Sequence, residues 1–483
     1  MSLTITHRTI LLAGFCVGFI PLISYWTLPQ SVVHPHHAFI FGYACSTLPF
    51  LYVWKTSHRF GTQGQDFAVL LFVAFATRIV LLTVPPVLSE DLWRYIWDGS
   101  LHWFGQNPYH YAPIDSRLDS IAQNADLAQV RQAVGHPHVP TIYPPFAQAS
   151  FALATIIGPS QVALRLLVIL SDVSIVAILW LWTQRAQLSP RPAVLYAFLP
   201  LSVIESAVGG HVDSIGVAML LFGLFLWNAN KPMLSTLAIW CAAGVKLVPA
   251  VMVAFFCKLR ARQGWRIILL FIALTSASLI LYQTYPHGLV TFAQKWRGND
   301  GIFALLSWAF ETYGIGLMDG LTSLPSVEQL VRMVVGADAN TSPSLSSGQM
   351  AFAYTKLCAV GMLATIGIYG LMTCDRVERF WLLIMSSLLL LSPMVHPWYI
   401  LWVMPFVFLL EDSKVYIRFA FTFWALSMWI TYWPRPHYLE TGIWTPIDWV
   451  PYVIYIPIIV ALLGALYRGE FMTHPKRAAN KNS

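Results

Sequence analysis

The sequence "FAVLLFVAFATRIVLLTVPP" at residues 67–86 is followed, two apolar residues later, by "SEDLWRYIWDGSLHWFGQNPYHYAP" at residues 89–113. The first stretch has the length and apolar character of a helix that crosses a lipid bilayer. The second holds three carboxylates, one arginine and three tryptophans. The chain therefore has its most polar and aromatic segment where a helix leaves the membrane, which indicates a functional site at the membrane surface.

The apolar pattern recurs along the whole chain. Hydrophobic residues make up 57% of the sequence and charged residues only 11%, whereas soluble proteins carry about 25% charged residues. The fold class predicted from these runs is an all-α polytopic membrane protein with about twelve full transmembrane helices and one broken or re-entrant helix pair. The predicted spans are residues 8–27, 37–54, 67–86, 162–184, 192–208, 213–229, 265–284, 351–373, 379–395, 397–411, 415–433 and 449–467.

Lysine and arginine concentrate in short loops between these spans, and such loops face the cytoplasm. Basic segments of this kind occur at 54–59, 183–191, 257–266, 374–379 and 468–483. They account for the formal net charge of +7 without a nucleic-acid partner. We therefore expect both termini to lie in the cytoplasm.

Residues 235–256 do not fit a single crossing, because basic segments lie on both sides of them. Gly244, Lys246 and Pro249 interrupt the apolar run, so we predict two short helices that meet at a turn, with Lys246 pointing toward the outer half of the membrane. Irregular backbone at that depth is tolerated where it lines a protein-walled cavity. The polar segments 87–161, 209–214, 295–300 and 392–399 then fall on the same outer face as Lys246.

This topology predicts four parts of the chain. They are two N-terminal helices (1–66), a central module (67–411) with a large outer loop (87–161), C-terminal helices (412–467) and a basic cytoplasmic tail (468–483). The outer loop is expected to carry interfacial helices, one of them at 146–158. Arg78 and Asp172 lie inside predicted spans at similar depth, and intramembrane charges rarely stay unpaired. We therefore predict that these two side chains form an ion pair.

The segment "EDLWRYIWD" at 90–98 is predicted to form a short surface helix. Asp91, Arg94 and Asp98 are spaced three and seven residues apart and share one face of that helix. Two acids beside an arginine can hold one carboxylate ionised and oriented as a base. A solvated surface helix without chemistry is the alternative.

Six short motifs occur in order along residues 67–411: Asp-x-x-Arg-Tyr-x-x-Asp-Gly, Gly-x-Asn-Pro-Tyr, Tyr-Pro-Pro, Gly-His-x-Asp, Lys-x-x-Pro and His-Pro-Trp-Tyr. This combination resembles the GT-C superfamily of membrane glycosyltransferases, and most of all the bacterial polyprenyl-phosphate-mannose-dependent mannosyltransferases. The resemblance implies transfer of a sugar from a polyprenyl-phosphate donor to an acceptor hydroxyl outside the cytoplasm. It marks residues 67–411 as the catalytic module, and it implies a bacterial inner-membrane protein whose active site faces the periplasm or the exterior. It also implies an acidic base in the first large outer loop, for which Asp91 is the best match and Asp98 the alternative.

The chemistry of this reaction selects further candidate residues. A sugar phosphate leaves as a stable anion, so the site needs positive charge and hydrogen-bond donors rather than a general acid. Candidate ligands of the donor phosphate are Lys246, Arg94, His211, Lys295, Arg297 and His396. Candidate contacts of the sugar or lipid are Tyr109, Asn107, Tyr143, Asp213, Trp398 and Tyr399. No metal ligands are predicted, although a divalent cation such as Mg²⁺ or Mn²⁺ stays open.

Two other functions remain open at this point. A flippase or transporter of polyprenyl-linked sugars would show internal repeats and charges near the midplane, and no repeat is evident here. A polymerase or ligase of lipid-linked glycans is chemically closer to a transferase. In each case the partners are a polyprenyl-phosphate sugar, a glycan or lipid acceptor and the membrane lipids, and we expect the chain to act as a monomer.

Overall fold

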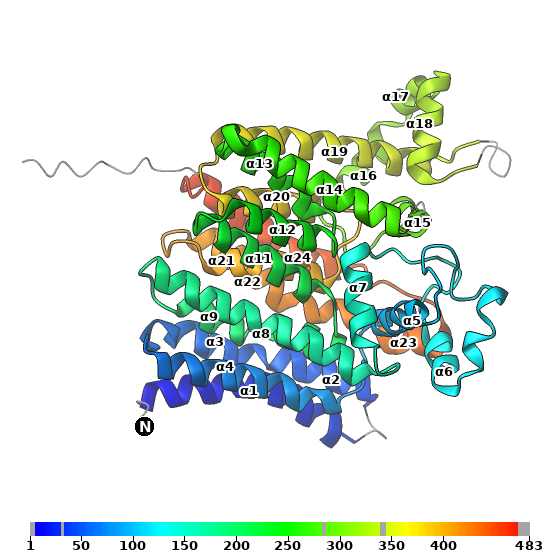
Figure 1. The fold of residues 1–483 in the computed structure, drawn as a ribbon. Helices are drawn as coiled ribbons and strands as arrows, with labels where there is room; N and C mark the ends of the chain where they lie inside the picture. Colours follow the sequence, from blue (N-terminus) through cyan, green and yellow to red (C-terminus); the bar gives the residue numbers. More distant parts are fainter. Residues whose placement is uncertain (1–4, 30–32, 283–285, 339–343, 472–483) are drawn as a thin grey trace, which may run out of the picture.

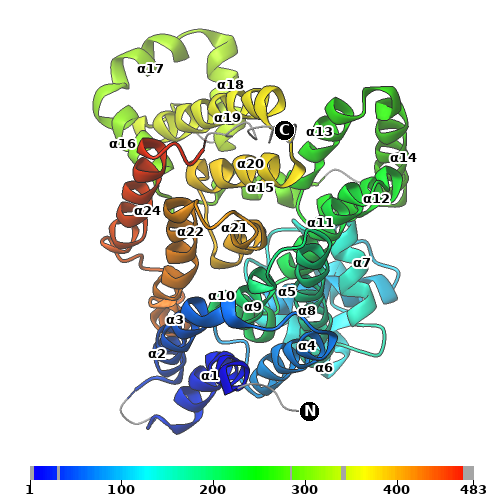
Figure 2. The same cartoon turned by 90° about the vertical axis from the view of Figure 1, so that its left-hand side faces the viewer.

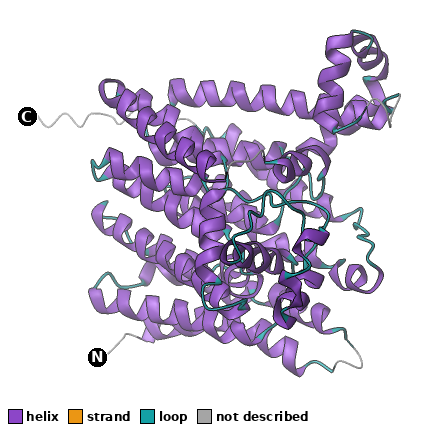
Figure 3. Ribbon diagram, turned by 45° about the vertical axis from the view of Figure 1, so that its right-hand side comes forward, coloured by secondary structure: helices purple, strands orange, loops and turns teal. Residues whose placement is uncertain are grey.

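The computed structural model describes residues 5–29, 33–282, 286–338 and 344–471. Within those ranges all regular elements are helices, and strand-like pairing is limited to one bridge between Gly298 and Met394. The helices are stacked in layers (Figures 1 and 3). This confirms the all-α fold class. Of the predicted basic tail, residues 472–483 lie outside the described part of the chain.

In Figure 1 the N-terminal part of the chain forms the lower layers and the loop helices at the right-hand end, whereas α11 and α12 lie in the middle of the picture. Helix α11 packs against both α8 and α12 (Figure 2). The helices of the first half of the chain are α1 (Ile5–Thr27), α2 (Pro35–Cys45), α3 (Thr47–Thr56), α4 (Gly64–Ile79), α5 (Asp91–Trp103), α6 (Ala125–Ala133), α7 (Pro145–Ala154), α8 (Gln161–Arg185), α9 (Arg191–Ala197), α10 (Pro200–Ile204), α11 (Asp213–Asn228) and α12 (Pro232–Ala243).

The second half completes the bundle, and its helix α22 packs against α24. Its helices are α13 (Val251–Leu259), α14 (Gly264–Tyr282), α15 (His287–Lys295), α16 (Ile302–Tyr313), α17 (Ile315–Thr322), α18 (Pro325–Val335), α19 (Ser347–Thr373), α20 (Val377–Leu391), α21 (Met404–Phe408), α22 (Val415–Ser427), α23 (Arg435–Thr441) and α24 (Val450–Tyr467). Two 3-10 segments, η8 (Pro397–Trp402) and η9 (Met428–Tyr432), and the π-helical turn η5 (Glu205–Gly209) contribute to the site described below.

The number of long spans is smaller than predicted. Six described helical segments are long and apolar enough to cross a membrane, or seven if the bent pair Arg191–Ala197 and Pro200–Gly209 counts as one span. Other predicted spans are shorter or broken helices: 37–54 is divided between α2 and α3, and 397–411 between η8 and α21. The chain is an integral membrane protein, and its apolar runs include buried helical pieces as well as long spanning helices.

The outer loop is folded into helices at one end of the bundle, where α5, α6 and α7 lie at the right-hand end of Figure 1. The predicted helix at 146–158 is confirmed as α7. The helices α5 and α7 pack closely, because a Cβ atom at Gly99 would come within 2.4 Å of the Phe151 carbonyl oxygen. Tyr95 stacks on Phe151 with ring centroids 4.6 Å apart, and this packing fixes the rotation of α5.

The predicted break near Lys246 is confirmed, since α12 and α13 are short helices joined by a turn. That turn is docked on the outer loop. The Ala147 N–H donates to the Gly244 carbonyl at 2.9 Å, and a Cβ atom on Gly244 would lie 2.5 Å from Phe146 Cβ. Glycine is therefore required where the Lys246 turn meets α7.

The predicted ion pair between Arg78 and Asp172 is also confirmed. Arg78 Nη2 lies 2.6 Å from Asp172 Oδ2, and both side chains are fully buried. The Tyr196 hydroxyl donates to the other carboxylate oxygen at 2.8 Å, and Arg78 also donates to Ser202 Oγ at 3.2 Å. These bonds join α4 to α8, α9 and α10. A buried pair of this kind is costly to break, because the remaining charge has no water to solvate it.

We predict that Asp172→Asn lowers the free energy of unfolding by about 3–5 kcal/mol, the usual cost of leaving one buried charge unpaired. Thermal or denaturant unfolding of the detergent-solubilised protein measures this effect. Replacing both partners with apolar residues (Arg78→Met with Asp172→Leu) should recover much of the loss. Asp115→Asn, which removes the exposed pair with Arg117, should leave the melting temperature unchanged, and an equal loss in both single variants would contradict the prediction.

Candidate active site

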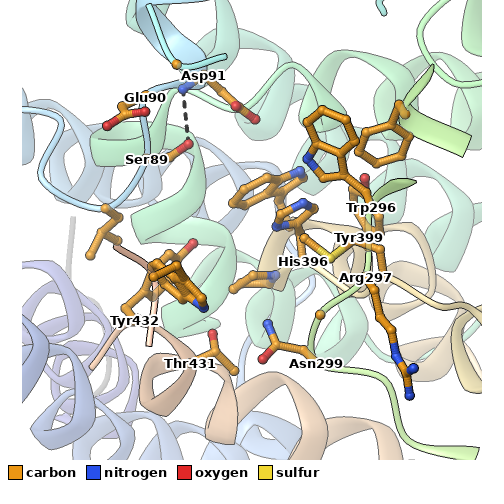
Figure 4. Close-up of a pocket in the computed structure, with 18 of the residues that line it drawn as sticks. Ser89, Glu90, Asp91, Trp296, Arg297, Asn299, His396, Tyr399, Thr431 and Tyr432 are labelled. Carbon is orange, nitrogen blue, oxygen red and sulfur yellow. Dashed lines mark hydrogen bonds between the residues drawn. The ribbon is translucent and has the colours of Figure 1, made fainter. Parts of the chain in front are cut away.

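A cavity of about 990 Å³ lies where the outer loop, the Lys246 turn and the C-terminal region meet. Figure 4 shows Ser89, Glu90 and Asp91 on one side of it, with His396 and Tyr399 facing the interior. The lining residues lie in segments 88–94, 135–144, 212–213, 245–247, 289–300, 394–399 and 430–452. Residues that are far apart in the sequence thus line one cavity at one end of the bundle.

Asp91 is the first residue of α5 and its carboxylate lines the cavity. Its backbone N–H donates to Ser89 Oγ at 3.1 Å (Figure 4), and the Tyr95 hydroxyl lies 3.5 Å from Oδ2. In the described part of the chain no lysine or arginine forms an ion pair with it. Burial raises the pKa of Asp91, with His211 opposing and Asp213 adding to the rise. The carboxylate is therefore unneutralised and a stronger base than an ordinary aspartate.

Asp98 is in a different environment, although it lies on the same helix. It is 2% exposed and does not line the cavity. Arg94 Nε lies 3.4 Å from one carboxylate oxygen, and Gln148 donates to the other at 3.2 Å. Gln148 in turn donates to Thr141 Oγ1 at 2.8 Å. These contacts connect α5 to α7 and to the preceding loop, so the geometry favours Asp91 over Asp98 as a base.

Lys246 is held at the cavity wall by Asp213 at the start of α11. Its ammonium lies 2.7 Å from Asp213 Oδ1 and 3.3 Å from the centroid of the Tyr399 ring. Trp402 Nε1 donates to the same carboxylate oxygen at 2.5 Å. The ammonium has three donors, so it can keep the bond to Asp213 and still bind an anion in the cavity.

Arg94 offers a second cationic group. Its Nη2 donates to the Val139 carbonyl, whereas Nη1 is buried without a hydrogen-bond partner, and the residue lines the cavity. Arg297 also lines it, but its Nε donates to Asp300 at 2.9 Å. Arginine donates in a planar fork that suits phosphate oxygens, so Arg94 is the better placed of the two for an anionic ligand.

Three aromatic rings form a parallel stack from the protein interior to the cavity. The ring of Trp398 lies between His211, at 3.7 Å, and His396, at 4.4 Å, measured between centroids. His211 is fully buried, and its Nδ1 lies 2.9 Å from Glu205 Oε2 in η5. The Tyr432 hydroxyl donates to the other oxygen of Glu205 at 2.8 Å. This stack connects the π-helical turn to the cavity surface at His396.

His396 contributes hydrogen bonding rather than charge. Burial, together with Lys246 and His211, lowers the pKa of His396 to about 3. The ring is therefore neutral at pH 7, with one nitrogen as donor and the other as acceptor.

Of the candidate residues predicted from the sequence, nine line the cavity: Asp91, Arg94, Tyr143, Asp213, Lys246, Arg297, His396, Trp398 and Tyr399. Asp98, Asn107, Tyr109, His211 and Lys295 are not among the lining residues. Asn107 and Tyr109 support the site instead, because the Tyr109 hydroxyl donates to the Tyr143 carbonyl at 2.6 Å and the Asn107 side chain accepts from the Tyr109 N–H. His211 lies behind Trp398, in the stack described above.

Sequence reasoning missed the segment 430–452, which forms one wall of the cavity. It lies between two apolar runs that read as spans, and only its charged and aromatic residues "RPHYLETGIWTPIDW" at 435–449 signalled another role. The described residues contain no group of three or more His, Cys, Asp or Glu side chains that could hold a metal ion.

We predict that Glu205→Gln lowers kcat/KM about tenfold, because hydrogen bonds to charged groups are worth about 1.5–3 kcal/mol and Glu205 orients the stack that ends at His396. The measurement is steady-state kinetics per folded molecule, beside a melting curve. Asp172→Asn is the matched control, since that buried carboxylate lies outside the cavity lining. Equal kcat/KM in both variants after correction for folded protein would show that Glu205 is structural only.

Two protein families and one known relative resemble this chain in sequence. The model of a family described as alpha-(1->6)-mannopyranosyltransferase, N-terminal domain, matches residues 4–262, and that of glycosyltransferase family 87 matches residues 141–393. Alpha-(1->6)-mannopyranosyltransferase A of Mycobacterium tuberculosis is 23% identical over 360 residues, which cover 68% of this chain and 64% of that relative. Each family match spans more than half of the chain. The chain therefore belongs to these membrane glycosyltransferase families, in agreement with the resemblance inferred from its motifs.

Proposed function

We propose that this protein transfers mannose from a polyprenyl-phosphate donor to a hydroxyl group of a glycan acceptor, on the extracytoplasmic face of a bacterial inner membrane. The observation that carries the proposal is the unneutralised carboxylate of Asp91, which lines the same cavity as Lys246 and Arg94. The relative named as an alpha-(1->6)-mannopyranosyltransferase supports mannose as the sugar and an α-(1→6) linkage as the product.

In the proposed reaction the acceptor oxygen forms a bond to C1 of the mannose while the bond from C1 to the phosphate oxygen breaks. The bonding electron pair leaves with the phosphate, so polyprenyl phosphate departs as an anion. The hydroxyl proton goes to the Asp91 carboxylate, which later releases it to water. A single displacement of this kind inverts the configuration at C1, and it needs one base rather than the acid and base pair of a glycosidase.

The cations at the cavity suit the departing phosphate. Lys246 and Arg94 supply N–H donors and positive charge where negative charge grows in the transition state. His396 adds a neutral donor. Since Asp213 already holds Lys246 in place, little reorganisation of the ammonium is needed when the phosphate binds, and preorganised donors of this kind are an effective means of stabilising a transition state.

The polyprenyl chain of the donor matches the apolar part of the cavity lining. Leu88, Leu247, Leu289, Phe292 and Met394 all line the cavity, and Leu247 in the Lys246 turn is also 56% exposed on the molecular surface. Apolar surface that is continuous from a cavity to the lipid phase favours a ligand whose head group is polar and whose tail stays in the bilayer.

We predict that Asp91→Asn lowers kcat for mannose transfer about 10²–10⁴-fold, the usual contribution of a general base. The assay is transfer from labelled polyprenyl-phosphate mannose by the purified protein in proteoliposomes. Asp98→Asn is the matched control on the same helix, and we expect a loss of stability with a much smaller effect on kcat. Full transfer by Asp91→Asn would remove Asp91 as the base. Donor translocation without transfer in the wild type would favour a flippase.

We also predict a pH dependence of kcat/KM that reports the Asp91 carboxylate. The base must be ionised, so activity falls as the pH drops through the pKa of Asp91 in the folded protein. Because that pKa is raised above the ordinary value of 3.8, the decline should begin at a higher pH than an exposed aspartate would produce. Measuring kcat/KM across pH tests this, and an acidic limb at or below pH 3.8 in a stably folded enzyme would contradict it.

A further inference from the structure

The cavity wall formed by residues 430–452 has no role in the donor chemistry described above. It runs from η9 through α23 to the start of α24. It also lies beyond the residues matched by either family, which end at 262 and 393. We define the lining residues Tyr438, Trp444, Asp448 and Tyr452 of this segment as the C-terminal wall.

The C-terminal wall presents aromatic rings to the cavity. Tyr438 and Trp444 pack edge to face, with ring centroids 5.9 Å apart, and Trp444 is 45% exposed although it lines the cavity. Tyr452 is also exposed. Rings of this type offer a flat apolar face together with a polar edge. A pyranose ring has the same division, with apolar C–H faces and hydroxyl groups around its rim.

The charge of the C-terminal wall differs from that of the donor side. Asp448 is exposed, and within the described residues it forms no ion pair. Arg435, the one lysine or arginine in residues 430–452, is paired with Glu90, with 3.3 Å between Nη2 and Oε1. A carboxylate without a neighbouring free cation repels phosphate but accepts hydrogen bonds from hydroxyl groups. This chemistry fits an uncharged sugar rather than the phosphate of the donor.

The C-terminal wall is connected to the base through the same ion pair. Glu90 precedes Asp91 directly, and Arg435 opens α23, the helix that carries Tyr438. Glu90 and the adjacent Asp91 thus connect the C-terminal wall to the part of the cavity that Lys246 and Arg94 line. An acceptor bound at the wall could present its hydroxyl to the Asp91 carboxylate.

We infer that the C-terminal wall is the acceptor subsite and that it binds an uncharged mannose-containing oligosaccharide, with a sugar ring stacked on Trp444 and hydroxyl groups bound to Asp448. This inference rests on the proposed function, since it names the acceptor of the same reaction. Exposed tryptophans also occur where helices meet lipid head groups. Trp449 provides the comparison, because it is 53% exposed in the same segment but does not line the cavity.

The test uses the full-length protein in proteoliposomes with polyprenyl-phosphate mannose as donor and an α-(1→6)-linked mannotrioside as acceptor. The initial rate is measured against the concentration of each substrate in turn, for the wild type, Trp444→Ala, Asp448→Asn and the control Trp449→Ala. We expect Trp444→Ala and Asp448→Asn to raise the acceptor KM at least fivefold while the donor KM stays within twofold. Trp449→Ala should change neither constant.

Each other outcome contradicts either the acceptor subsite or the proposed function. An unchanged acceptor KM in both Trp444→Ala and Asp448→Asn, or an equal effect of Trp444→Ala and Trp449→Ala, would refute the acceptor subsite and assign these rings to the membrane interface. A rise in the donor KM alone would place the donor at this wall instead. If the wild type transfers no mannose from the donor to any acceptor, the proposed function itself fails. Melting curves of all variants separate these results from loss of folding.

Discussion

The cost of leaving a charge unpaired in an apolar environment governs both the fold and the site. Inside the bundle Arg78 and Asp172 avoid this cost because they pair with each other, and their bonds hold four helices together. At the cavity Lys246 pairs with Asp213, and Arg435 pairs with Glu90. Asp91 lacks a pair of this kind in the described part of the chain. In the proposed reaction this carboxylate is the base that takes the acceptor proton.

Under the proposed function, the position of this carboxylate also follows from where the two substrates would be found. A polyprenyl-linked donor stays in the bilayer, whereas a glycan acceptor comes from water. The two can meet only where the helices end. Asp91, at the start of α5, lines the cavity. The Lys246 turn and the segment 430–452 line other parts of it. The exposed Leu247 of this turn and the aromatic wall therefore suit two ligands of opposite polarity in the cavity that Asp91 lines.

Much of this arrangement could be predicted from the sequence, and the rest shows the limits of local patterns. The break at Lys246 and the pair between Arg78 and Asp172 could be predicted because each places charged residues inside an otherwise apolar run. The spacing of Asp91 and Asp98 put both on one helical face, but the packing of Gly99 and Tyr95 on Phe151 decides which acid reaches the cavity. Span length could not separate lipid-facing helices from buried pieces such as α10 and α21. The wall at 430–452 was missed because only tertiary packing turns it toward the site.

In the proposed complex Asp91 faces the donor C1 while Lys246 and Arg94 hold the donor phosphate in this cavity. The most direct measurement is an experimental structure of the Asp91→Asn variant with polyprenyl-phosphate mannose bound. We expect the phosphate to lie within hydrogen-bond distance of Lys246 Nζ or Arg94 Nη1, with the mannose C1 turned toward position 91. A phosphate bound elsewhere, for example among the basic segments at the opposite ends of the helices, would contradict the proposed donor site.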